Sequence, residues 1–168
     1  ATIRRQRQMC IRDRMKVAQL LPELNFGGVE RGTIDLANFL VSQGHDALVI
    51  SAGGVLESEL DTHVKSLKIP ISKKSISALM QFKALKKILL EDKPDIVHVR
   101  SRFPAWIYLL AIRGLADDQK PILVSTFHGL YSKPWYSQSM AKSNSIISIS
   151  NTVKPVSYTH LTLPTNGC

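Results

Sequence analysis

The body of this 168-residue chain lacks cysteine, because Cys10 and Cys168 both lie near the ends. A disulfide framework and a thiolate metal site are therefore excluded there, and we expect no metal. No apolar run approaches the roughly 18 residues of a membrane-spanning helix, and residues 1–14 lack the apolar stretch of a secretory signal. The acidic residues are scattered and no carboxylate pair stands out, so a self-contained hydrolase is unsupported. A hydrophobic content of 44% and the chain length fit one globular domain.

The formal net charge of +9 at first suggests a nucleic-acid partner. Residues 1–14, however, hold five arginines against one aspartate. Without them, 17 Lys and Arg remain against 12 Asp and Glu, a net charge of +5. We therefore expect no nucleic-acid partner. A milder use of the remaining charge is peripheral docking on an anionic membrane surface.

Both ends of the chain differ in character from the segments beside them. "RQRQMCIRDR" and "VSYTHLTLPTN" resemble translated sequencing-adapter read-through, and neither continues the neighbouring periodicity. We expect residues 1–14 and 156–168 to be non-native tails, with Met15 as the natural start. The alternative is a natural basic arm and a natural loop.

Strand and helix patterns alternate between the two ends. Short apolar runs typical of buried strands occupy residues 16–21, 47–52, 68–71, 95–99, 121–127 and 145–150. Helical spacing is expected over residues 29–43, 56–67, 75–93 (with Ser75 or Ser77 as the cap) and 104–115. Residues 132–144 are mixed. Because the central strands are apolar on both faces, the sequence predicts an α/β fold, a Rossmann-like doubly wound parallel sheet.

Ligands bind such sheets outside the carboxyl ends of the strands, so the segments that follow the strands matter most. Gly27 and Gly28 separate the first strand from the first helix. With Gly32 they do not form G-x-G-x-x-G, and Thr33 stands where a P-loop needs lysine. What remains is a generic anion site at a helix N-terminus. The alternative is a tight turn that needs a positive φ.

Three histidines lie in or beside predicted strands. His128 directly follows one, where it could donate a hydrogen bond to a ligand or titrate near neutral pH; it could equally be a satisfied loop residue. His98 lies inside a strand and is expected in the core. His45 lies in a turn and is expected to be solvated.

Two basic clusters follow other strands. Arg100 and Arg102 flank Ser101 just before a helix, where guanidinium groups suit a phosphate or carboxylate, although they could instead pair with local acids. "KPWY" (133–136) places a lysine beside two aromatic residues. That cluster could stack on a sugar, lie at a membrane interface or simply cover the core.

The ordered set of motifs resembles the N-terminal domain of family-four, GT-B-fold glycosyltransferases. The resemblance rests on "KVAQLLPELNFGGVERGTIDLANFLVSQGHD", "KPDIVHVRSRFPAWI", "STFHGLYS" and "MAKSNSIISISNTV", and it spans residues 15–154. Within that family the combination is most similar to enzymes of lipopolysaccharide-core or related surface-glycan assembly. Residues 15–155 would then form the N-terminal Rossmann-like domain.

The resemblance implies retaining transfer of a sugar from a nucleotide-sugar donor to a glycan or lipid-linked acceptor. Gly27 and Gly28 would face the donor diphosphate, and His128 would position the transferred sugar. Arg100, Ser101 and Arg102 would border the acceptor.

The same resemblance bears on what the chain can do alone. In this family a second Rossmann-like domain supplies most nucleotide contacts, and we expect that C-terminal donor-binding domain to be absent here. The 168-residue chain should then be inactive. No cofactor is implied, and the site of action would be the cytoplasm, peripherally on the inner face of the bacterial plasma membrane. Glu30 would contribute to a helix cap. The alternative is a stand-alone Rossmann-like module that binds a nucleotide or phosphometabolite without catalysis.

Overall fold

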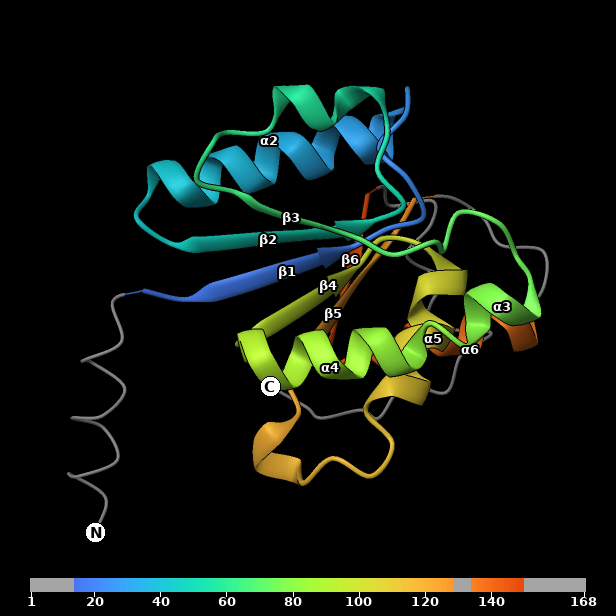
Figure 1. Ribbon diagram of the computed structural model, residues 1–168. Helices are drawn as coiled ribbons and strands as arrows, with labels where there is room; N and C mark the ends of the chain where they lie inside the picture. The colour runs from blue at the N-terminus through green and yellow to red at the C-terminus, as the bar shows by residue number, and fades with distance from the viewer. Residues whose placement is uncertain (1–13, 129–133, 150–168) are drawn as a thin grey trace, which may run out of the picture.

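Six parallel strands form one sheet in the computed structural model, which describes residues 14–128 and 134–149 (Figure 1). Their order across the sheet is β3-β2-β1-β4-β5-β6. The strands are β1 (Lys16–Leu20), β2 (Asp46–Ser51), β3 (Lys65–Lys68), β4 (Ile96–Val99), β5 (Ile122–Phe127) and β6 (Ser145–Ser148). The predicted fold class, a Rossmann-like doubly wound parallel sheet, is confirmed.

Helices cover both faces of the sheet (Figure 1). One face carries α2 (Gly28–Ser42) together with the 3₁₀ helix η1 (Val55–Glu59). The other carries α4 (Phe82–Asp92), α5 (Arg102–Ala111) and α6 (Pro134–Ala141), with the short α3 (Ile76–Leu79) ahead of α4. A second 3₁₀ turn, η2 (Asp117–Gln119), precedes β5.

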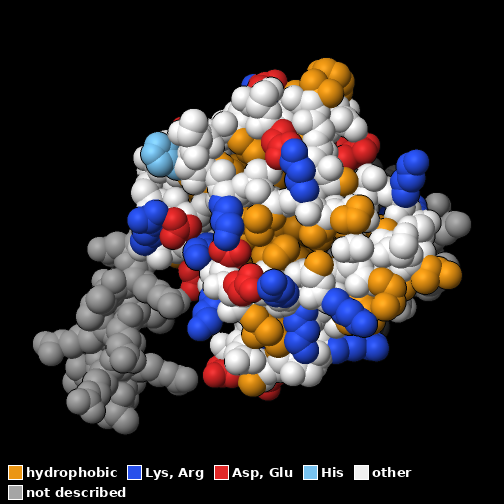
Figure 2. Space-filling model, in the orientation of Figure 1, with side chains coloured by type: hydrophobic (Ala, Val, Ile, Leu, Met, Phe, Trp, Pro, Cys, Tyr) orange, Lys and Arg blue, Asp and Glu red, His pale blue; other side chains and the backbone are white. Residues whose placement is uncertain are grey.

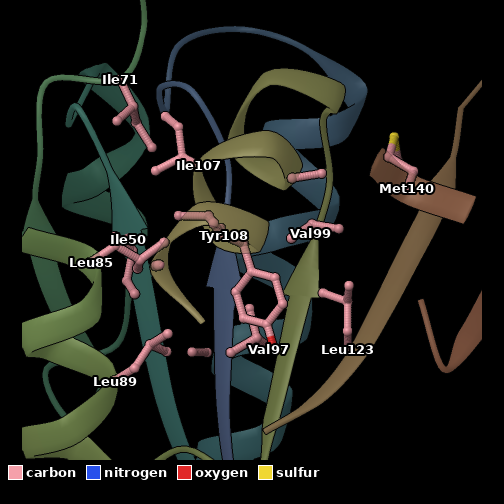
Figure 3. Close-up of a cluster of buried hydrophobic side chains, with 14 of the residues drawn as sticks. Ile50, Ile71, Leu85, Leu89, Val97, Val99, Ile107, Tyr108, Leu123 and Met140 are labelled. Carbon is pink, nitrogen blue, oxygen red and sulfur yellow. The ribbon is translucent and has the colours of Figure 1, made fainter. Parts of the chain in front are cut away.

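The core is split by the sheet into two layers, and β2 shows why. Leu48 and Ile50 point into the layer under α4 and α5, whereas Ala47 and Val49 point into the layer under α2. Figure 3 shows the larger layer, in which the Tyr108 ring lies among strand and helix side chains. A strand that is buried on both faces reads as a continuous apolar run, which explains why the sequence pattern predicted this sheet.

The predicted helix over 56–67 is wrong. The segment forms only η1, then a turn, then β3, which begins three residues before the predicted strand over 68–71. The turn is held by Asp61, whose carboxylate accepts from the His63 backbone N–H at 2.8 Å and whose own N–H donates to Asn38 at 2.8 Å. These bonds stop the helix before it completes a second turn.

The helix expected over 75–93 is interrupted at Met80 and Gln81, between α3 and α4. Its predicted cap is confirmed, because the Ser75 hydroxyl accepts from the Ala78 N–H at 3.1 Å. Helix α5 begins two residues earlier than predicted, at Arg102, and the mixed segment contains α6.

Candidate functional site

Successive strands are added on one side of β1 as far as β3, and then on its other side from β4 onward. β1 and β4 are parallel neighbours, yet the helix that follows β1 covers one face and the helix that follows β4 covers the other. Such a divergence is the topological switch point at which open α/β sheets bind ligands. The starts of α2 and α5 therefore flank the same carboxyl edge, and the end of β5 lies next to it.

The glycine pair at the start of α2 is not demanded by backbone strain. Gly27 has φ 167°, which is extended backbone, and Gly28 is the first helical residue. The alternative of a tight turn with positive φ is therefore wrong for this pair. Both residues are exposed, and a Cβ added to Gly28 would meet nothing within 4 Å. The first N–H groups of a 15-residue helix are thus open to approach.

Glu30 in the first turn of α2 folds back toward the N-cap residue. A Cβ added to Gly27 would collide with the Glu30 carboxylate. This is the behaviour expected of a cap contributor, because a negative charge is favourable at a helix N-terminus. The same carboxylate raises the pKa of His128, so the start of α2 and the end of β5 lie within electrostatic range of each other.

His128 is half-buried just beyond β5. Burial lowers its pKa below the ordinary value for histidine, and the positive charge of Arg100 lowers it further, against the opposing effect of Glu30. Both effects favour the neutral imidazole over the charged imidazolium. The neutral ring can donate or accept a hydrogen bond without presenting a positive charge.

Arg100 lies beneath this edge, with 8% of its surface exposed. Its Nε donates to the Gln19 side-chain oxygen at 3.1 Å, and one terminal nitrogen donates to the Gly32 carbonyl at 3.1 Å. The guanidinium therefore joins β4 to β1 and to the first turns of α2. In these bonds its partners are an amide and a carbonyl rather than the local acid considered from the sequence.

Gln19 is a functional neighbour that the sequence analysis missed. It is 1% exposed, and its amide nitrogen donates to the Thr33 carbonyl at 2.8 Å while its oxygen accepts from Arg100. Both polar ends of the amide are thus satisfied inside the sheet. A lone amide within the apolar run "KVAQLL" was the available signal.

The other two predicted histidine environments can be compared directly. His98 is buried and its Nε2 lies 2.6 Å from the Thr126 hydroxyl, which confirms a core histidine. Burial, with smaller effects of Arg100 and His128, lowers its pKa to about 4. His45 is half-buried in its turn, and its Nδ1 accepts an exposed hydrogen bond from the Met15 N–H at 3.3 Å, so the ring keeps contact with solvent as expected.

The start of α5 supplies the other side of the edge. Ser101 is the N-cap residue and is half-buried, but its hydroxyl makes no capping hydrogen bond. The Arg102 guanidinium carbon lies 5.1 Å from the centroid of the Tyr136 ring, and the Lys74 Nζ lies 5.3 Å from the same centroid. Tyr136 thus gathers two cations beside the helix start. Lys133 and the Trp135 side chain, from the same predicted cluster, lie outside the described residues.

Within residues 14–128 and 134–149, no group of three or more His, Cys, Asp or Glu side chains could hold a metal ion. No helix in that part of the chain is long and apolar enough to cross a membrane.

Comparison with known proteins gives a consistent result. The family model described as Glycosyltransferase Family 4 matches residues 26–161. The crystal structure of a glycosyltransferase from Rickettsia africae ESF-5 is 34% identical with a TM-score of 0.70, and the match covers 85% of this chain and 38% of that one. A putative UDP-N-acetylglucosamine 2-epimerase from Listeria monocytogenes, 13% identical with a TM-score of 0.61 over 86% of this chain and 41% of that one, supports the fold alone. No curated protein matches significantly. This chain spans less than half the length of either solved structure.

Proposed function

Because the chain belongs to glycosyltransferase family 4, we propose that it is the acceptor-side half of a retaining GT-B enzyme of cell-surface polysaccharide or lipopolysaccharide synthesis. Such an enzyme moves a sugar from a nucleotide-sugar donor to a glycan or lipid-linked acceptor. One observation carries the proposal. The open start of α2, His128 and the start of α5 share the switch-point edge of one sheet.

Gly27 and Gly28 are proposed to receive the donor diphosphate. When the glycosidic bond breaks, negative charge builds up on the leaving diphosphate, and open N–H groups at a helix N-terminus stabilise that charge. The Glu30 carboxylate now lies against Gly27. A diphosphate at this position would require that carboxylate to rotate away, because two anions cannot share one helix start.

His128 is proposed to hydrogen-bond the transferred sugar. Positive charge develops at the anomeric carbon during the transfer, so a charged imidazolium nearby would oppose the reaction. Burial and the neighbouring Arg100 lower the pKa of His128 and favour the neutral ring. A neutral ring can still position a sugar hydroxyl.

Arg100, Ser101 and Arg102 are proposed to border the acceptor in different ways. Ser101 and Arg102 are half-buried at the start of α5 and could contact the acceptor directly. Arg100 would support that border from below, because its hydrogen bonds hold α2 against the central strands.

A second domain is proposed to close over this edge and to supply most nucleotide contacts. The N-terminal domain proposed over residues 15–155 would then bind donor diphosphate weakly and would not transfer sugar without that second domain. The whole enzyme would act in the cytoplasm, peripherally at the inner face of the bacterial plasma membrane. Sugar transfer by the purified 168-residue chain would contradict this division of labour.

The diphosphate assignment can be tested on the chain with inorganic pyrophosphate as the probe. In an NMR titration, the backbone amide signals of Gly27, Gly28 and Val29 should shift together. Gly28→Asp should weaken this binding roughly fivefold or more, since it places a like charge at the helix start. Ser42→Asp puts the same charge at the opposite end of α2 and should leave binding unchanged. Shifts that avoid the start of α2, or equal losses in both variants, would refute the assignment.

A further inference from the structure

The net charge of the chain body is concentrated in one segment. Residues 72–90 contain five lysines and no aspartate or glutamate. Outside residues 1–14, the chain carries 17 Lys and Arg against 12 Asp and Glu. The excess of five positive charges in residues 15–168 therefore equals the charge of this single segment, and the rest of the body is balanced.

The same segment exposes large apolar side chains. Ile76 is 83% exposed and Met80 is 47% exposed. Met80 and Gln81, between α3 and α4, keep right-handed helical dihedrals, so helical spacing continues across the interruption. Ile76, Met80, Lys83 and Lys87 follow one another at intervals of three or four residues and are all exposed. Two apolar residues are thus followed along one face by two lysines.

The opposite side of this segment is fixed to the protein body. Ala78, Leu85 and Leu89 are buried, and Leu79 and Phe82 pack against the core. Lys87 makes only a 3.7 Å ion pair with Glu91 on its own helix. Figure 2 shows basic and apolar side chains interspersed over the face that carries α3 and α4. The exposed residues therefore lie on a rigid support, as a surface patch, which we define as Lys73, Lys74, Ile76, Met80, Lys83 and Lys87.

The patch also adjoins the proposed acceptor border. It follows β3, at the same carboxyl edge of the sheet as the starts of α2 and α5. Lys74 and Arg102 both lie near the Tyr136 ring, at 5.3 Å and 5.1 Å from its centroid. One end of the patch is therefore within a side chain's reach of the residue proposed to meet the acceptor.

We propose that this patch docks on an anionic lipid bilayer, with Ile76 and Met80 entering the headgroup region and the lysines resting on lipid phosphates. Apolar side chains next to several lysines, in a segment of 19 residues (72–90) without aspartate or glutamate, are the composition that interfacial membrane helices use. A second copy of the chain would bring lysines against lysines. A nucleic acid would leave Ile76 and Met80 against a phosphate backbone. The benefit of docking, delivery of a lipid-linked acceptor to Arg102, rests on the proposed function.

Co-sedimentation of the 168-residue chain with vesicles tests the docking itself. Vesicles of phosphatidylcholine that contain about 30% phosphatidylglycerol should bind the chain, whereas vesicles of pure phosphatidylcholine should bind it weakly. Lys83→Gln with Lys87→Gln should lower partitioning about twenty-fivefold, since each lysine near an anionic leaflet contributes roughly fivefold. Ile76→Ser should lower it roughly tenfold.

Matched variants isolate the patch from the basic residues 1–14, which every variant keeps. Arg113→Gln with Lys142→Gln removes the same charge from exposed positions elsewhere, and Phe39→Ser removes an apolar side chain that is 57% exposed on α2. Both should bind like the parent chain. The proposal would be overturned if the control variants lost as much binding as the patch variants, or if the patch variants bound like the parent chain. It would also be overturned by equal binding to neutral vesicles, or by a dimer or a DNA complex that depends on the patch while vesicle binding does not. Because no donor or acceptor is present, the result is independent of the sugar-transfer proposal.

Discussion

Two glycine pairs follow neighbouring strands of this sheet, and they differ in backbone conformation and in the space around them. After β2, Gly53 has φ 85° and Gly54 has φ 156°, and a Cβ on Gly54 would overlap the backbone of Leu24. After β1, Gly27 and Gly28 have no such strain, and Gly28 faces open space. The fold requires glycine at positions 53 and 54. Gly27 and Gly28 instead leave the start of α2 accessible, which the fold alone does not require.

The same division separates other residues of identical type. Arg100 is buried and donates hydrogen bonds to Gln19 and Gly32, whereas Arg102 lies half-buried at a helix start. His98 is buried and hydrogen-bonded to the Thr126 hydroxyl, whereas His128 is half-buried at the carboxyl edge of the sheet. We call the buried residues beneath the switch point, Arg100 and His98, the support, and the half-buried residues above it, Arg102 and His128, the rim. Substitutions should distinguish the two, since support residues affect stability and rim residues affect ligand binding.

Gly54→Ala should have the largest effect on stability. The new methyl group would overlap the Leu24 backbone and would also hold a φ that alanine disfavours. We expect a loss of about 4 kcal/mol in the free energy of unfolding, or no folded protein, in urea denaturation followed by circular dichroism. A loss within about 0.5 kcal/mol would mean that the two glycine pairs do not differ in the way described.

Arg100→Met should be nearly as damaging. It leaves the Gln19 oxygen and the Gly32 carbonyl without the guanidinium that now donates to them. We expect a loss of roughly 3 kcal/mol by the same denaturation measurement. Arg102→Met, the matched change at the rim, should remove about 1 kcal/mol or less, since its contact with Tyr136 is partly exposed. Equal losses for the two arginines would remove the distinction between support and rim.

The buried His98 should make the fold sensitive to mild acid. Burial lowers the pKa of His98 to about 4 in the folded chain, below its ordinary value of 6.5. The unfolded chain therefore takes up the proton first, and stability falls as pH drops from about 6.5 toward about 4. The loss from pH 7 to pH 5 should be about 2 kcal/mol.

His98→Gln should flatten that part of the stability profile, which urea denaturation at several pH values would measure. His63→Gln is the control, because the His63 side chain is 80% exposed. A profile that changes with His63 rather than with His98 would place the pH sensitivity outside the buried support.

The sequence predicted the sheet well because its evidence is local. A buried parallel strand is a short apolar run, and five of the six predicted strands lie within two residues of the observed ones at each end. The third strand failed because β3 is a partly exposed edge strand, KSLK, that is placed by its backbone pairing with β2, from Leu48 with Lys65 to Ser51 with Lys68. Such pairing leaves no apolar run in the sequence of the strand itself.

The site was predictable as a location but not in its details. The rule that ligands bind at carboxyl strand ends pointed to the starts of α2 and α5 and to the end of β5. It could not separate Arg100 from Arg102, because the burial of Arg100 depends on Gln19, 81 positions away. Nor could it reveal whether Gly27 and Gly28 need a positive φ, since that depends on how the loop meets its helix.

Gly28→Ala should have the smallest effect on stability and gives the comparison its sharpest control. Its Cβ would lie in open space on a helical residue, so alanine should change the free energy of unfolding by no more than about 0.5 kcal/mol, with stabilisation the expected sign. The same methyl group would stand where a ligand approaches the helix start. Pyrophosphate binding, followed through the Val29 amide signal, should therefore weaken several-fold while stability holds. A variant that binds pyrophosphate like the parent chain would show that access to Gly28 is not what the glycine provides.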